Sequence, residues 1–97
     1  MAKYELPIYG ENDEIIKTYA TNHVAWAVYI KAAEMETTIK GKPAVEQFNA
    51  VGDILKEVFK GLTDEHLLMA DGEDVMNTFA QIVSGGQNIK GGKGKNV

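Results

Sequence analysis

Residues 4–19 read YELPIYGENDEIIKTY, and this stretch decides how the fold begins. Tyr4, Leu6 and Ile8 occupy alternate positions, the period of a β-strand, so the three side chains share one face. The polar run GEND follows, and a polar run with a glycine is typical of the connection in a hairpin. The alternation resumes in IIKTY, which suits a second strand. The pattern predicts a β-hairpin over about residues 3–20.

The next segment has helical spacing. Its apolar residues recur at intervals of four, four, three and four, which is one stripe of an α-helix: Val24, Val28, Ala32, Met35 and Ile39. Thr21 or Asn22 is expected to cap the start of this helix with a side-chain oxygen. Gly41 is expected to stop it. We therefore predict the first helix over about residues 22–40.

A second helix is predicted over about residues 43–60. Pro43 suits a position in its first turn, and Gly61 suits the position just past its end. Its apolar residues again keep helical spacing: Val45, Phe48, Val51, Leu55 and Val58. The connection to the first helix is only a few residues long, so the two helices are expected to pack antiparallel.

Two further helices are predicted over about residues 63–70 and 72–84. Thr63 supplies a capping hydroxyl ahead of two acidic residues, and the run DGED at residues 71–74 repeats the pattern before an amphipathic segment. Residues 86–97 contain four of the ten glycines and three lysines, a composition typical of a flexible tail. The expected fold is therefore α+β and mainly α: one domain over residues 1–85, with an N-terminal hairpin and a small bundle of three to four helices.

Composition and charge exclude several classes of function. Ninety-seven residues suffice for one small domain, and the net charge is −4 with every positive charge on lysine. Nucleic-acid binding relies on many lysine and arginine contacts to phosphate, so no nucleic-acid partner is expected. The chain has no cysteine, no apolar run long enough to cross a bilayer and no signal-peptide pattern at its start. We expect a cytoplasmic protein with no membrane partner.

No catalytic or metal-binding pattern emerges. His23 and His66 lack the spacing of a helical zinc pair, and residues 71–74 lack the alternating oxygen ligands of a calcium loop. The glycine-rich end, residues 91–95, lacks the strand and helix that flank a phosphate-binding loop. The sequence predicts a protein that is not an enzyme and needs no metal or other cofactor, which favours a binding or assembly role.

A second apolar stripe accompanies the first on the long helix. It consists of Trp26, Tyr29, Ile30 and Ala33, which also keep helical spacing. These residues could close the core beneath the hairpin, as aromatic side chains usually do in small domains. The alternative is that they anchor another chain, since one helix of a small bundle seldom needs two apolar stripes. We take these four residues as the candidate partner-binding site.

Two stretches resemble the small tail assembly chaperones of long-tailed bacteriophages and prophages of Gram-positive bacteria. They are LPIYGENDEIIKTY at residues 6–19 and GLTDEHLLMADGEDVMNTF at residues 61–79. The resemblance extends from about Tyr4 to Val83 and preserves the order of an extended N-terminal element, two long helices, the Gly-Leu-Thr-Asp-Glu segment and a closing helix. It rests on turns and helix caps and involves no catalytic residue.

The resemblance implies that the protein coats the tape measure protein while the phage tail is built, in the host cytoplasm, and is absent from the mature virion. It also implies contact with the tail tube protein, and self-association would suit a protein that coats a filament. The alternatives are a structural phage protein, such as a tail-completion or head–tail connector protein, and another small protein-interaction module.

The family commonly also makes a longer, frameshifted product. The candidate frameshift junction consists of Gly91-Gly92-Lys93 and Gly94-Lys95-Asn96. The codons of each triplet can contain a seven-nucleotide sequence of the X-XXY-YYZ type, on which a ribosome slips. The gene sequence decides this point.

Overall fold

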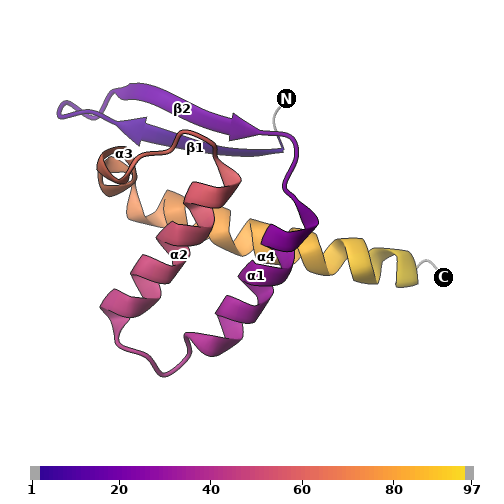
Figure 1. The fold of residues 1–97 in the computed structure, drawn as a ribbon. Helices are drawn as coiled ribbons and strands as arrows, with labels where there is room; N and C mark the ends of the chain where they lie inside the picture. The colour runs from indigo at the N-terminus through magenta and orange to yellow at the C-terminus, as the bar shows by residue number, and fades with distance from the viewer. Residues whose placement is uncertain (1–2, 96–97) are drawn as a thin grey trace.

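The computed structural model describes the backbone of residues 3–95 and the side chains of residues 3–85. An antiparallel hairpin precedes four helices, which confirms the predicted fold class (Figure 1). In chain order the elements are β1 (Tyr4–Tyr9), β2 (Ile15–Thr21), α1 (Trp26–Thr38), α2 (Ala44–Val58), α3 (Asp64–Met69) and α4 (Gly72–Lys95).

The hairpin places one face of β1 on the core. Tyr4, Leu6 and Ile8 are buried, as their alternation predicts, and Leu6 pairs with Tyr19 of β2. The register shifts between Ile8 and Tyr9, where the connecting loop begins. Asp13 lies in this loop with a φ of 64°, a left-handed conformation that aspartate tolerates better than most residues.

The start of α1 differs from the prediction. The helix begins at Trp26, and its N-cap residue is Ala25, which makes no side-chain capping bond. Neither expected cap, Thr21 or Asn22, caps the helix. The side-chain oxygen of Asn22 accepts from the Lys3 N–H at 3.0 Å. The Thr21 hydroxyl donates to the His23 carbonyl oxygen at 2.9 Å and accepts from the His23 N–H at 3.3 Å, which closes a local turn. Threonine often forms such turns in place of a cap, and here this delays the helix by four residues.

Helix α2 follows α1 through a short loop, and the two helices run in opposite directions as predicted (Figure 1). Gly41 supplies the left-handed residue of this loop, with a φ of 84°. Pro43 is the N-cap residue of α2, one position before its first turn. Gly61 has a φ of 88° but stands two residues past the C-cap Phe59, not in the adjacent position that the sequence suggested.

The starts of α3 and α4 carry the predicted caps. The Thr63 hydroxyl accepts a hydrogen bond from the His66 N–H at 3.1 Å. A carboxylate oxygen of Asp71 accepts one from the Asp74 N–H at 3.1 Å. Each cap satisfies a backbone donor that the first helical turn leaves free, so the two helix starts are fixed in position.

Helix α4 crosses behind α1 and α2 and lies under the hairpin (Figure 1). Between these elements lies a buried cluster, to which the described residues of the hairpin and of all three longer helices contribute. It contains Tyr4, Leu6, Ile8, Tyr19, Val28, Tyr29, Ala32, Val51, Ile54, Leu55, Val58, Phe59, Leu62, Phe79, Ile82 and Val83.

The predicted end of the last helix at residue 84 is wrong, because α4 continues to Lys95. The sequence suggested a stop at Gly85, since glycine often follows the end of a helix. In the structure Gly85 is a close-packing residue: a methyl group there would overlap the hydroxyl of Tyr4 and lie 3.5 Å from the ring of Tyr29. The flexibility of residues 86–97 stays a prediction, and residues 96–97 lie outside the described part of the chain.

Candidate protein-binding groove

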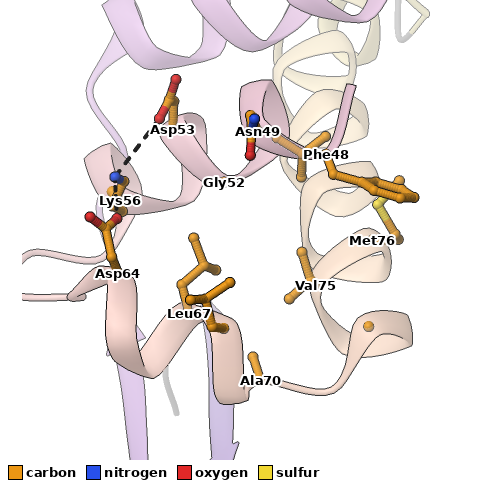
Figure 2. Close-up of a pocket in the computed structure, with 13 residues that line it drawn as sticks. Phe48, Asn49, Gly52, Asp53, Lys56, Asp64, Leu67, Ala70, Val75 and Met76 are labelled. Carbon is orange, nitrogen blue, oxygen red and sulfur yellow. Dashed lines mark hydrogen bonds and ion pairs between the residues drawn. The ribbon is translucent and has the colours of Figure 1, made fainter. Parts of the chain in front are cut away.

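An apolar groove lies between α2, α3 and the first turns of α4 (Figure 2). Its volume is about 640 Å³, and most of its lining is apolar. The residues that line it are Phe48, Asn49, Val51, Gly52, Asp53, Lys56, Asp64, Leu67, Leu68, Ala70, Gly72, Val75 and Met76. Below, "the groove" means this set of residues.

The spacing of α2 explains how one helix serves both the core and the groove. Val51, Leu55 and Val58 face the core. Phe48, Gly52 and Lys56 stand four residues apart on the neighbouring face and line the groove. The core stripe is therefore only part of the apolar surface of α2.

Gly52 sets how closely α3 approaches α2. A methyl group at this position would lie 2.8 Å from Cδ2 of Leu67, which is too close for two carbon atoms. Because Gly52 has no side chain, Leu67 can lie over α2 and contribute to the groove. The Thr63 cap fixes where α3 begins and so helps to place Leu67.

Large apolar side chains stand exposed at one end of the groove. Phe48 on α2 is 61% exposed and Met76 on α4 is 44% exposed. Figure 2 shows both at the end of the groove away from Lys56. Leu68 of α3, which also lines the groove, is 86% exposed. Single exposed apolar residues are common, but several gathered around one concave site are typical of a binding surface.

The opposite end of the groove is charged. The Lys56 ammonium group lies 2.5 Å from a carboxylate oxygen of Asp64 and 3.8 Å from one of Asp53 (Figure 2). The hydrogen bond to Asp64 raises the pKa of Lys56 above its usual value. All three side chains retain contact with water, so these ion pairs contribute little to the stability of the fold. Their main effect is to hold the three side chains in place at this end of the groove.

The predicted partner site on α1 divides in the structure. Trp26 is 53% exposed, and Ile30 and Ala33 are also exposed on the same face of the helix. Tyr29 is only 6% exposed, and its hydroxyl lies 3.1 Å from that of Tyr4 in the core. Tyr29 therefore belongs to the core, and the exposed α1 stripe consists of Trp26, Ile30 and Ala33.

The remaining candidate residues do not come together. His23 is exposed, whereas His66 Nδ1 lies 2.7 Å from the hydroxyl of Tyr19, which also donates to the Gly61 carbonyl oxygen at 3.3 Å. Within the described residues, no three histidine or acidic side chains are arranged to hold a metal ion. The acidic run at residues 71–74 contributes the Asp71 cap of α4.

The candidate frameshift junction falls partly within the structure. Residues 91–95 belong to the helical backbone of α4, and Asn96 lies outside the described part of the chain. Of the helices searched, none combines the length and apolar character that a membrane span requires.

Sequence reasoning missed the groove. Helical spacing groups Val45 and Phe48 with the buried residues of α2, yet both are exposed. Leu67, Leu68 and Met69 are the large apolar residues of α3, and none of the three is buried. A signal was present: the apolar arc of α2 is wider than one buried face requires.

Comparisons with known proteins leave the family open. No protein-family model, curated protein or solved structure matches this chain.

Proposed function

We propose that this protein is a tail assembly chaperone, which binds the tape measure protein of a long-tailed phage and keeps it soluble until the tail is assembled. The observation that carries the proposal is the apolar groove with Phe48, Leu68 and Met76 exposed around it. The resemblance of residues 6–19 and 61–79 to this chaperone family supports it further.

The groove has features suited to this task. A tape measure protein is long and helical, and an unassembled amphipathic helix exposes an apolar stripe to water. Grooves between helices take such stripes by helix-in-groove binding, with side chains at positions i, i+4 and i+7 as anchors. Methionine is adaptable and suits a site that must accept successive, non-identical segments of one long partner.

The overall charge also fits a solubilising role. The chain carries a net charge of −4, so each bound copy would add negative charge to the complex and oppose aggregation. Many copies along one partner would act together, which allows each single contact to remain weak and reversible. On this proposal the protein acts in the host cytoplasm and does not remain in the virion.

Co-expression with the tape measure protein of the same tail gene cluster tests the proposal. We expect the tape measure protein to remain soluble and to co-purify with several copies of this protein. A variant with both Phe48→Ser and Met76→Ser should lose this effect. The control variant Ile30→Ser changes an apolar residue of similar exposure on α1, outside the groove, and should retain it.

Two outcomes would contradict the proposal. One is a tape measure protein that is equally soluble without this protein and does not co-purify with it. The other is detection of this protein as a stoichiometric part of purified particles, which would favour a tail-completion or connector protein. If Ile30→Ser loses the ability to keep the tape measure protein soluble and the groove variant retains it, the α1 stripe is the binding surface instead.

A further inference from the structure

The groove has a charge pattern as well as an apolar floor. Asp53 and Asp64 stand at one end. Glu73 stands with Phe48 and Met76 in a shallow extension of the other end. Among the residues that line the groove and this extension, these three carboxylates are accompanied by one ammonium group, that of Lys56.

The charge of Lys56 is already engaged by the protein itself. Its ammonium group contacts carboxylate oxygens of both Asp64 and Asp53. One positive charge therefore faces two negative charges at this end, and Glu73 adds a third at the other. A positive group on a ligand would be attracted at both ends, whereas a negative group would be repelled.

The distance between the ends matches a short piece of helix. Phe48 and Lys56 are eight residues apart on α2, which corresponds to about 12 Å along the helix axis. A ligand helix lying along α2 would place apolar residues at i, i+4 and i+7 over the same length, since these span about 10 Å. Residues about one turn beyond this segment would reach the carboxylates.

From these observations we infer that the groove takes an amphipathic helix whose apolar segment is followed and preceded by lysine or arginine, so that a basic residue stands at each of its two ends. The inference rests on the proposed function, because it specifies the chemistry of the partner segment at the same site. It predicts that tape measure segments with basic flanks are the ones that this protein covers.

An extended ligand fits the molecule less well at this place. The groove is bordered by α2, α3 and α4, whose backbone groups are used within the helices and at their caps. A bound strand would need a free sheet edge, and the edge of β1 near the groove already forms a bridge between Ile8 and Ala70. Side-chain packing is therefore the means of recognition.

Three synthetic peptides of about 18 residues test the inference, a length at which an alanine-rich peptide forms helix in water. All three carry leucine at i, i+4 and i+7 in an alanine–glutamine background. Their flanks consist of lysine in the first, glutamine in the second and glutamate in the third. Binding is measured by titration into the full-length protein, with chemical shifts of the methyl groups of Met76 and Leu68 locating the site.

We expect the lysine-flanked peptide to bind about 10-fold more tightly than the glutamate-flanked peptide at low salt. The difference should shrink to about 2-fold at 1 M salt, where the screening length is about 3 Å. The variant Asp53→Asn with Glu73→Gln leaves the Lys56–Asp64 pair in place and should remove most of the preference. The variant Phe48→Ser with Met76→Ser should weaken binding of all three peptides at least 10-fold. The control Ile16→Ser changes a 46% exposed residue of β2, outside both the groove and the α1 stripe, and should change nothing.

The outcomes separate the inference from the proposed function. Equal binding of lysine-flanked and glutamate-flanked peptides, lost on Phe48→Ser with Met76→Ser, overturns the charge inference and leaves the proposed function standing. Binding of none of the peptides, together with no solubilisation of the tape measure protein, overturns both. Sedimentation of the free protein tests for a second copy in the groove. A dimer that Phe48→Ser with Met76→Ser dissociates would identify a second copy as the occupant and overturn the inference.

Discussion

Replacement of Gly85 by alanine probes the packing that carries α4 past its predicted end. Gly85 lies inside a helix, where alanine is normally favoured over glycine by about 1 kcal/mol. Its added methyl group, however, would overlap the Tyr4 hydroxyl, which is hydrogen-bonded to the Tyr29 hydroxyl at 3.1 Å. The two effects oppose each other, so the sign of the stability change tests the structure.

The magnitude follows from three contributions. Overpacking of a filled core costs about 1–3 kcal/mol. Displacement of Tyr4 from Tyr29 loses a buried hydrogen bond, which adds about 1 kcal/mol. The gain in helix propensity offsets about 1 kcal/mol. We therefore expect Gly85→Ala to destabilise the protein by about 1–3 kcal/mol.

A double-mutant cycle with Tyr4→Phe isolates the contact. Tyr4→Phe alone should cost about 1–2 kcal/mol, because it leaves the Tyr29 hydroxyl without its partner. With that hydroxyl gone, Gly85→Ala should become neutral or stabilising by up to about 1 kcal/mol. The expected coupling between the two sites is thus about 2 kcal/mol.

Urea unfolding followed by far-UV circular dichroism measures all four members of the cycle. Gly72→Ala serves as the control, because nothing lies within 4 Å of a methyl group at that position. The unfolding free energy of this variant should be unchanged or slightly raised. Additive effects of Gly85→Ala and Tyr4→Phe, or a more stable Gly85→Ala protein, would refute the close approach of Tyr4 to α4.

Three further predictions concern a helix cap, an exposed aromatic side chain and pH. Thr63→Ala removes the acceptor of the His66 N–H and should lower the unfolding free energy by about 1 kcal/mol in urea melts; an unchanged midpoint would contradict the cap. Trp26→Ala should cost about 1 kcal/mol or less, since Trp26 is half exposed, and a loss near 3 kcal/mol would show that this ring is core. Burial, together with its hydrogen bond to Tyr29, raises the pKa of Tyr4, so the folded protein keeps this proton after the unfolded chain has lost it. The contribution of Tyr4 to stability should therefore be constant below about pH 10 and fall above it, by at most about 1.4 kcal/mol per pH unit, and Tyr4→Phe should remove this part of the fall.

Local patterns predicted the elements well where each residue had one role. The alternation of Tyr4, Leu6 and Ile8 predicts the buried face of β1, and the structure confirms it. Thr63 caps α3 as predicted because no competing turn captures its hydroxyl. At Thr21 such a turn does form, with His23, and the start of α1 moves accordingly.

The structural role of each glycine depends on the tertiary structure. Gly41 and Gly61 supply left-handed turns, which single-sequence reasoning anticipates. Gly52 and Gly85 instead allow a side chain from a distant part of the chain to approach a helix: Leu67 in one case and Tyr4 in the other. No local pattern distinguishes a glycine that ends a helix from one that lets a neighbour pack, so the end of α4 was misplaced.

The groove escaped prediction for a related physical reason. Helical spacing groups apolar residues by face, but it does not say how much of that face the rest of the protein covers. On α2 the core covers Val51 and Leu55, whereas α3 and α4 stop short of Phe48. The approach of α3 is limited by the contact of Leu67 with Gly52. Coverage of Phe48 therefore depends on a contact between helices, and the same contact creates the surface that we propose a partner helix fills.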